Sequence, residues 1–407
     1  MMNQPGKQPF SSRRPAQRLL GCCLFAIATL LWTSCQPTQP TAPIKVGLVA
    51  PFSGPEAAAG EAIQRGMLLA IDEINAAGGV LGRPIELVSQ NLMTMEETAV
   101  SDLINNDSVV ALFGGVFDGK MPGYRNLANE KEIPLFGAWG AATYTADIPR
   151  DHAYLFCVSI TNTDAGQFLA QYGTRVLGIQ QPAIISDQSD WSMANVEPLK
   201  IGLSEQGIPS VAIASFDSGD ANMLSELVAL RDTKADALFL LAGTFESTAV
   251  IRTLATLGWD VPVLSYWGAS SRAFIEQAGL ENVSDVYILQ TFAFADAPSD
   301  KSQALLTAYH QRFGTNQLSE IREPTAVAQA YDGIHLLAQA VEQAGTTTGS
   351  SVKSALETLE TPYDGVIKVY KRPFSPTNHT ALTTDDYMMT VWHINTLIPA
   401  PRPRLEN

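Results

Sequence analysis

The sequence predicts an α/β protein whose sheets are parallel and covered by helices on both faces. Its 407 residues leave room for two or three domains. Apolar residues make up 46% of the chain and charged residues 16%, a composition that is typical of a globular protein with ample core. From residue 44 onward, short β-rich apolar runs alternate with segments of helical periodicity. This alternation predicts right-handed βαβ units, and such sheets bind ligands at the carboxyl ends of their strands.

The first strand is expected at residues 44–50, IKVGLVA, and a helix follows at 60–79. One face of that helix is apolar, with Ile63, Met67, Ile71 and Ile74. Gly78 stands where a C-terminal cap is expected. Further strands are expected at 84–90, 109–115, 133–139, 181–187, 209–216, 236–243 and 261–268. Helical segments, such as 221–232 and 246–258, separate these strands.

The N-terminal segment has the pattern of a bacterial signal peptide. Four basic residues and no acidic residue precede an apolar run that extends from Leu19 to Trp32. At about 14 residues, this run is shorter than the roughly 17 to 25 residues of a membrane-spanning helix, and it fits the apolar region of a signal peptide. Ser12-Arg13-Arg14 faintly resembles a twin-arginine signal, but Ala16-Gln17 lacks the apolar residues that should follow.

The next residues resemble a lipobox, the site at which bacterial lipoproteins are cleaved and acylated. Thr33-Ser34-Cys35 has the small residues and the cysteine, while Trp32 stands where leucine is preferred. Residues 1–34 are therefore expected to be a lipoprotein signal peptide and Cys35 a lipid anchor. Residues 35–43, rich in proline and threonine, would be a tether that holds the folded body away from a membrane.

The charge of the chain argues against nucleic acid as a partner. The net charge is −15 at pH 7. Removal of residues 1–34 takes four of the 26 basic residues and none of the 41 acidic ones, so 22 against 41 leaves −19. Nucleic-acid binding requires clustered Lys and Arg instead. Beyond the signal segment and Cys35 only Cys157 remains, so no disulfide framework is expected, and Cys157 is interpreted as a small buried residue.

Residues 46–88, VGLVAPFSGPEAAAGEAIQRGMLLAIDEINAAGGVLGRPIELV, resemble the opening of a known family. The family is the type I periplasmic substrate-binding proteins, the branched-chain amino acid and amide group of ABC importers. The run from Glu73 to Pro84 is highly specific to it. The resemblance extends from about Ile44 to about Ile394. It implies two Rossmann-like lobes with parallel central sheets, joined by three crossover strands and closing by a hinge over a ligand cleft.

The resemblance also implies that each lobe is discontinuous in sequence. The apolar pattern places the three crossings at 158–163, 288–292 and 363–369. The expected boundaries are 44–160 plus 292–362 for lobe 1, 161–291 plus 363–400 for lobe 2, and 401–407 for a tail.

The turn after the strand at 109–115 has three interpretations. Gly114-x-x-x-x-Gly119-Lys120 has the spacing of a phosphate-binding P-loop, but Met121 lacks the hydroxyl that Mg²⁺ needs, and Asp118 would repel phosphate. The loop could instead merely turn the chain, with Asp118 as the cap of the next helix. The resemblance favours a cleft loop that contacts the ligand. Asp118 would oppose the carboxylate of an amino acid, so it either points away as a cap or faces a cation or hydroxyls.

The other candidate ligand-binding residues also follow predicted strands. The family's Ala-Thr ligand loop resembles Ala141-Ala142-Thr143, although Thr143 also suits a simple helix start. Trp191 stands where an aromatic residue usually closes over the ligand. In amino-acid-binding relatives, the loop in which Trp267 stands often carries an acid for the ammonium group of the ligand. Glu246, one strand earlier, either substitutes for that acid or is an acid favoured by a helix dipole. The complete predicted set is Ser53, Phe117, Asp118, Trp139, Ala141, Ala142, Thr143, Trp191, Thr244, Glu246, Tyr266, Trp267 and Phe292.

These residue types favour a particular ligand chemistry. Each aromatic residue taken singly suits a core position, but Phe117, Trp139, Trp191, Tyr266 and Trp267 all follow strands on the two sides of the expected cleft. Aromatic faces with acids nearby suit a cationic or amphiphilic compound. We therefore expect an amino-acid-like or amine-bearing ligand, with Asp118 or Glu246 facing its positive end.

Catalysis is not expected. The chain has no G-x-S-x-G or H-E-x-x-H motif, and its five histidines have no metal-ligand spacing. His379 is interpreted as a structural hydrogen-bonding residue. The expected function is that of a monomeric, lipid-anchored extracytoplasmic solute-binding protein of an ABC importer, without cofactor, that delivers its ligand to permease and ATPase partners. A ligand sensor that reports to a membrane receptor is the alternative.

Overall fold

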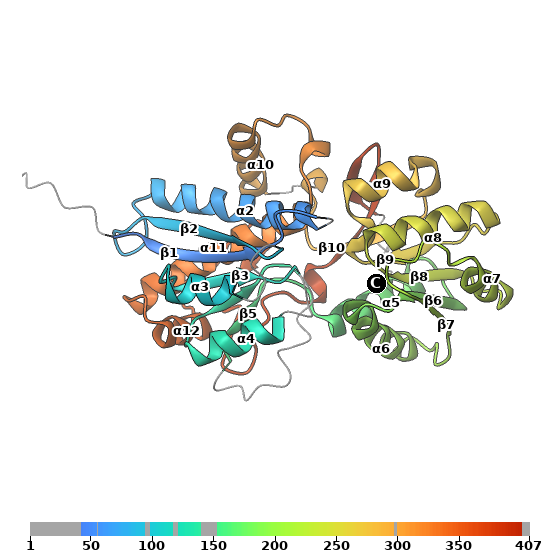
Figure 1. The fold of residues 1–407 in the computed structure, drawn as a ribbon, viewed down its shortest axis with the longest axis horizontal. Coiled ribbons are helices and arrows are strands. Elements are labelled where there is room, and N and C mark those ends of the chain that lie inside the picture. Colours follow the sequence, from blue (N-terminus) through green and yellow to red (C-terminus); the bar gives the residue numbers. More distant parts are fainter. Residues whose placement is uncertain are drawn as a thin grey trace, which may run out of the picture. The chain divides into compact units, whose positions relative to one another are not determined.

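A computed structural model describes residues 42–54, 56–93, 98–116, 121–139, 153–296 and 299–400 (Figure 1). The predicted α/β fold with two lobes is confirmed. The five strands of the first sheet are, in order across it, β2 (Ile85–Asn91), β1 (Ile44–Ala50), β3 (Ala111–Gly114), β4 (Leu135–Gly137) and β5 (Leu155–Cys157). The seven strands of the second are β14 (Thr396–Pro399), β13 (Met388–His393), β10 (Val286–Gln290), β9 (Val263–Ser265), β8 (Ala237–Leu241), β6 (Pro182–Asp187) and β7 (Ala212–Phe216).

Both sheets are wound in the same way. The strands β7-β6-β8-β9-β10 are parallel neighbours in the same relative order as β2-β1-β3-β4-β5. β13 then pairs antiparallel with β10, and β14 antiparallel with β13. The winding reverses between β1 and β3 in one sheet and between β6 and β8 in the other. Each sheet therefore has the topological switch point at which open α/β sheets bind ligands.

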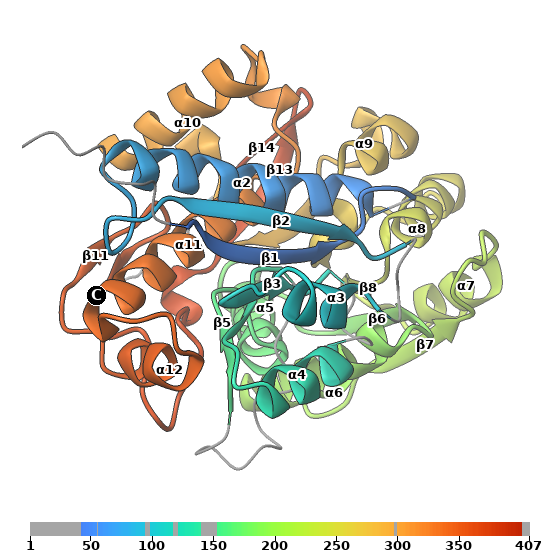
Figure 2. The same cartoon turned by 60° about the vertical axis from the view of Figure 1, so that its left-hand side comes forward.

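Helices cover both faces of each sheet (Figure 2). The first lobe has α2 (Ala57–Ala76), α3 (Ala99–Asn105), α4 (Met121–Glu130), α10 (Asp300–Phe313), α11 (Pro324–Ala344) and α12 (Gly349–Glu357). The second lobe has α5 (Asn162–Arg175), α6 (Asp190–Glu205), α7 (Leu224–Asp232), α8 (Thr244–Leu257) and α9 (Arg272–Ala278). Short 3-10 segments are η4 (Trp267–Ala269), η5 (Leu280–Asn282), η6 (Phe294–Asp296), η7 (Leu318–Glu320) and η8 (Thr384–Asp386).

Successive side chains of a buried strand point to opposite faces of the sheet, so they belong to two core layers, one on each face. In the first sheet, Leu48 and Phe113 pack in the cluster that contains α2 and α11, whereas Val49 and Leu112 pack in the cluster of α3 and α4. Strands that are apolar on both faces are the signature of a parallel sheet between two helical layers. Among the described residues, no helix is both long and apolar enough to cross a membrane.

Helices α2 and α11 approach each other closely at a glycine. A Cβ atom on Gly66 of α2 would lie 2.2 Å from the backbone oxygen of Val327 in α11. Because a backbone carbonyl cannot rotate away, a side chain at this position would force the two helices apart.

We expect Gly66→Ala to lower the free energy of unfolding by about 1–3 kcal/mol, the usual effect of overpacking. Urea denaturation followed by circular dichroism measures the change. Gly123→Ala in α4 is the matched control, because a Cβ there has no neighbour within 4 Å. That control should be neutral or stabilising, as alanine is the better helix former. Equal stability of the Gly66→Ala protein and wild type would contradict the close approach.

The predicted third crossing at 363–369 is wrong, because this segment stays with the first lobe. Residues Tyr363–Asp364 and Val369–Tyr370 form a small hairpin, β11–β12. The buried carboxylate of Asp332 in α11 accepts hydrogen bonds from the backbone N–H groups of Val366 at 2.8 Å and Ile367 at 3.0 Å. The hairpin is thus tied to α11 by a buried charge, which the apolar pattern does not reveal.

The chain leaves the first lobe only after it has passed β5. The N–H of Cys157 donates to the carbonyl of His379 at 2.8 Å, and the N–H of Ala381 donates to the carbonyl of Cys157 at 2.9 Å. Since β13 begins at Met388 in the second sheet, the third passage between the lobes lies between Ala381 and Met388.

Candidate functional site

The loops that follow the carboxyl ends of the strands form the candidate site, because side chains from both lobes meet there. Trp139, which follows β4 of the first lobe, stacks on Trp267, which follows β9 of the second. Their ring centroids lie 4.3 Å apart with an interplanar angle of 29°, and each residue is only 7% exposed. The structure thus brings together two of the predicted aromatic residues across the lobes.

A second pair of predicted aromatic residues lies within the second lobe. Trp191, in the first turn of α6, packs edge-on against Tyr266 with centroids 5.5 Å apart and an interplanar angle of 90°. Tyr266 is fully buried, and burial raises the pKa of its hydroxyl. Neither the hydroxyl of Tyr266 nor the indole Nε1 of Trp267 has a hydrogen-bond partner among the described residues. Buried polar atoms without partners are rare and often mark functional sites.

An acid that the sequence analysis missed organises the switch point of the second lobe. Asp187 ends β6 and is 2% exposed. One carboxylate oxygen accepts from the backbone N–H of Ser189 at 2.9 Å, and the other accepts from the N–H of Gly243 at 3.1 Å. Asp187 therefore joins the loops after β6 and β8, the two strands that flank the switch point. Its place at the end of an apolar strand, two residues before the serine cap of α6, is the sequence signal for this role.

Glu246 occupies the first turn of α8 but does more than complement a helix dipole. Its Oε1 accepts from the backbone N–H of Gly219 at 2.8 Å, which fixes the loop after β7, and the residue is 8% exposed. A Cβ on Gly243 would lie 2.8 Å from its Oε2, so the carboxylate folds back over the start of the helix. Glu246 is thus a buried carboxylate at the start of α8, and its contact with a ligand stays a prediction.

Glu56 is the counterpart of Glu246 in the first lobe, and the sequence analysis missed it. It precedes α2 at the end of the loop after β1, and its side chain makes no capping hydrogen bond. Burial raises the pKa of Glu56, and the negative charge of Glu246 raises it further. The two lobes therefore present carboxyl groups to each other.

Among the described residues, the charge of the loops at the candidate site is one-sided. We consider the described loop segments that follow the parallel strands of both sheets, without those after β5 and β10. They are 51–54 and 56, 92–93, 115–116, 138–139, 187–191, 217–222, 242–246 and 266–270. None of these segments contains Lys, Arg or His. They contain the acids Glu56, Asp187, Asp190, Asp217, Asp220 and Glu246. Acids that line one region focus a negative potential, which attracts cations and repels anions.

The remaining predicted residues are distributed more widely. Thr244 opens α8. Ser53 is exposed in the loop after β1, where its hydroxyl accepts from the Asn91 side chain at 3.3 Å. Phe292 is buried and packs edge-on against Phe294, with centroids 4.9 Å apart. The predicted residues that lie outside the described part of the chain are Cys35, Phe117, Asp118, Ala141, Ala142 and Thr143.

Comparisons with known proteins agree with this architecture. The family model described as periplasmic binding protein matches residues 43–393. A leucine-, isoleucine-, valine-, threonine- and alanine-binding protein of Pseudomonas aeruginosa is 24% identical over 332 residues, which cover 78% of this chain and 84% of that protein.

Solved structures show the same fold. The branched-chain amino acid transporter substrate-binding protein LivJ of Streptococcus pneumoniae, in complex with isoleucine, has a TM-score of 0.74 at 23% identity, over 88% of this chain and 100% of that chain. A solute-binding protein of an ABC transporter from R. palustris, in complex with benzoate, has a TM-score of 0.70 at 18% identity, over 88% and 95%. With a family model that matches most of its length, the chain belongs to the periplasmic binding protein family.

Proposed function

We propose that the chain is the extracytoplasmic solute-binding protein of an ABC importer. It captures an amino acid or a related small, amine-bearing solute between its lobes and delivers it to a permease, while partner subunits hydrolyse ATP. The observation that carries this proposal is the meeting of strand-end loops of both lobes at the Trp139–Trp267 stack. A solute that contacts both lobes binds one arrangement of the lobes more tightly than the others, and it stabilises that arrangement by this difference in affinity.

The acidic site supports an amine-bearing solute. Relatives include proteins named for leucine, isoleucine and valine, and a structural neighbour holds benzoate, so family membership leaves the solute open. In this chain the described loops carry acids and no basic residue, which opposes a simple anion such as benzoate. An ammonium group suits both the carboxylates of Glu56 and Glu246 and the faces of the tryptophans.

The N-terminal part of the proposal rests on the sequence pattern. We propose that residues 1–34 are removed and that Cys35 carries the lipid anchor, which places the folded body outside the cytoplasm.

The solute class can be tested with three compounds that share a 3-methylbutyl group: leucine, 3-methylbutylamine without the carboxylate, and 4-methylpentanoate without the amine. We expect leucine or the amine to raise the melting temperature and the carboxylate to leave it unchanged. A ligand at 100 times its Kd stabilises by about 2.7 kcal/mol, which a thermal-shift assay detects. The same assay should then be extended to other amino acids, amides, polyamines and aromatic acids.

Trp267→Leu provides the site control, and we expect it to weaken binding at least tenfold because the stacking surface is lost. Trp259→Leu is the matched variant, since Trp259 is half-buried before β9, at the opposite end of that strand. It should lower the melting temperature while the ligand-induced shift remains. A flat response to every compound in the panel would overturn the proposed function.

A further inference from the structure

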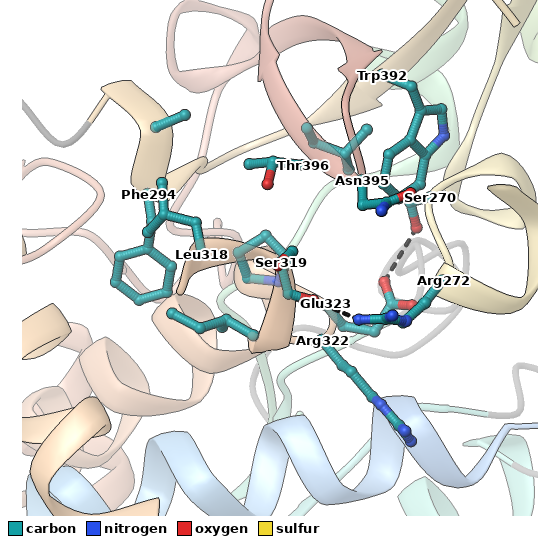
Figure 3. A pocket seen from close by; sticks show the side chains of 14 residues that line it. Ser270, Arg272, Phe294, Leu318, Ser319, Arg322, Glu323, Trp392, Asn395 and Thr396 are labelled. Atoms are coloured by element: carbon teal, nitrogen blue, oxygen red, sulfur yellow. Dashed lines mark hydrogen bonds between the residues drawn. The ribbon is translucent and has the colours of Figure 1, made fainter. Parts of the chain in front are cut away.

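A hydrogen bond between two buried side chains connects the lobes close to Trp267, whose carbonyl lies 2.7 Å from the same serine hydroxyl. Ser270, which follows η4 in the second lobe, donates to Glu323, which precedes α11 in the first, at 3.0 Å. Ser270 is 4% exposed and Glu323 is 6% exposed. Figure 3 shows the two side chains pointing toward one another at the edge of a cavity of about 30 Å³, room for about one water molecule.

Glu323 has a backbone conformation that is unusual for its residue type. Its φ angle is +44°, in the left-handed region that non-glycine residues rarely adopt. It occupies the N-cap position of α11, yet its side chain makes no capping hydrogen bond. The carboxylate is turned toward the second lobe instead of toward its own helix. A strained residue whose side chain bridges the two lobes is a candidate for a conformational role.

A second hydrogen bond runs beside this one. The guanidinium of Arg272, in the first turn of α9, donates to the backbone carbonyl of Ser319 in η7 at 3.0 Å. The same guanidinium is paired with Glu276 at 2.6 Å, so its charge is already balanced within α9. Ser270 and Arg272 thus contact the first lobe from one short stretch of the second.

The charges around Glu323 come from three elements. Glu56, before α2, disfavours its ionised form, whereas the adjacent Arg322 favours it. Arg272 of α9 lines the same cavity but is paired with Glu276. Figure 3 shows the Arg322 side chain extending away from Ser270. The hydroxyl of Ser270 is the only side-chain donor to Glu323 among the described residues.

We propose that Glu323 and Ser270 form a proton-dependent latch between the lobes, which holds the arrangement in which Trp139 and Trp267 are stacked. In this arrangement the carboxyl group is shielded from water by both lobes. When the lobes separate, Glu323 loses Ser270 and gains solvent, and its negative charge is no longer penalised. The latch requires no ligand, so it is independent of the proposed transport function.

The sign of the pH dependence follows from burial. Burial raises the pKa of Glu323 from its ordinary value of 4.5 to about 7. The protonated form is therefore favoured in the stacked arrangement, and the ionised form favours separation. As the pH falls from about 8, the stacked arrangement is expected to become more populated. The ratio of stacked to separated molecules should increase by up to about tenfold per pH unit between about pH 7 and pH 4.5.

The stacked tryptophans supply the readout. Near-ultraviolet circular dichroism of the full chain, purified in mild detergent, is recorded from pH 8 to pH 5, and the spectrum of Trp139→Phe is subtracted to isolate the signal of the pair. In wild type this signal should increase as the pH falls through 7. In Glu323→Gln, which keeps an acceptor for Ser270 but no titrating proton, the signal should already be high at pH 8 and should not increase as the pH falls through 7.

Two further variants separate the latch from general effects. Glu86→Gln removes an exposed carboxylate at the amino end of β2 and should titrate like wild type. Ser270→Ala keeps the titrating group but removes the hydroxyl that contacts Glu323 and the carbonyl of Trp267, so its pair signal should be weaker than that of wild type at every pH and should still increase as the pH falls. Far-ultraviolet spectra confirm that each variant is folded. A flat signal in wild type, or a Glu323→Gln protein that titrates as wild type does, would overturn the latch and leave the proposed solute-binding function untouched.

Discussion

Replacement of Asp332 with alanine is expected to lower the free energy of unfolding by about 3–5 kcal/mol, the effect of removing one side of a buried charged network. The carboxylate of Asp332 is inaccessible to water and accepts four hydrogen bonds. Two come from the N–H groups of Val366 and Ile367, and two from the hydroxyls of Tyr363 at 3.1 Å and Tyr370 at 3.0 Å. Alanine would leave four buried donors without an acceptor.

The network explains why a charge is retained in the core. Burial raises the pKa of Asp332 to about 6, while its four donors lower it and so favour the ionised form. The carboxylate accordingly holds the β11–β12 hairpin on α11 through side-chain and backbone donors together. Gly365 lies so close that a Cβ there would be 2.8 Å from an oxygen of Asp332.

Amide hydrogen exchange at Val366 and Ile367, with the apparent melting temperature, measures the effect of Asp332→Ala. We expect exchange at both amides to accelerate by orders of magnitude, because their acceptor is gone. Asp332→Asn retains one acceptor oxygen and should lose less stability. The exposed Asp364→Ala, on the same hairpin, should change stability by less than about 0.5 kcal/mol. Unchanged exchange in Asp332→Ala would show that the hairpin is held by other contacts.

Gly268→Ala is expected to weaken solute binding at least tenfold, although residue 268 has no side chain with which to contact a ligand. A Cβ at this position would lie 1.9 Å from the carbonyl oxygen of Ala242, in the loop after β8, and 3.0 Å from the hydroxyl of Ser247. The backbone must therefore shift, and Trp267, the preceding residue, shifts with it. Overpacking of this kind also lowers stability by about 1–3 kcal/mol.

Calorimetry with the compound that gives the largest thermal shift measures the affinity, and the circular-dichroism signal of the tryptophan pair reports the displacement of Trp267. The first lobe offers a parallel constraint, since a Cβ on Gly115 would lie 2.1 Å from the carbonyl of Trp139. Gly123→Ala, with open space around its Cβ, is the control and should bind as wild type does. Full affinity in Gly268→Ala would mean that the placement of Trp267 is unimportant for binding.

Much of the fold could be predicted from local patterns. The predicted strand at 44–50 coincides with β1, and the predicted helix at 60–79 overlaps α2 at 57–76. These elements are long and strongly periodic, and their apolar residues face a core that any such sequence must build. The expected third crossing failed for the opposite reason. The segment at 363–369 has a strand-like pattern, but the partner that decides its place, Asp332, is distant in sequence.

In the candidate site, too, local patterns predicted some features, and others depended on contacts between distant residues. Trp139, Trp191, Tyr266, Trp267 and Glu246 could be selected because they follow predicted strands, and parallel strands bring their carboxyl ends to one edge. The sequence by itself could not pair Trp139 with Trp267 or Trp191 with Tyr266. It also did not reveal Glu56 or Asp187, whose roles arise from partners in other loops.

The amino-acid sequence by itself determined the α/β class, the succession of strands and helices, and the acidic, aromatic character of the loops after the strands. These properties follow from periodicity, composition and the direction of parallel strands. Only the tertiary structure decided which loops meet, where the chain passes between the lobes, and that Glu323 of one lobe accepts a hydrogen bond from Ser270 of the other. Those decisions depend on burial and on contacts between residues far apart in the chain, and both exist only after the two lobes have formed.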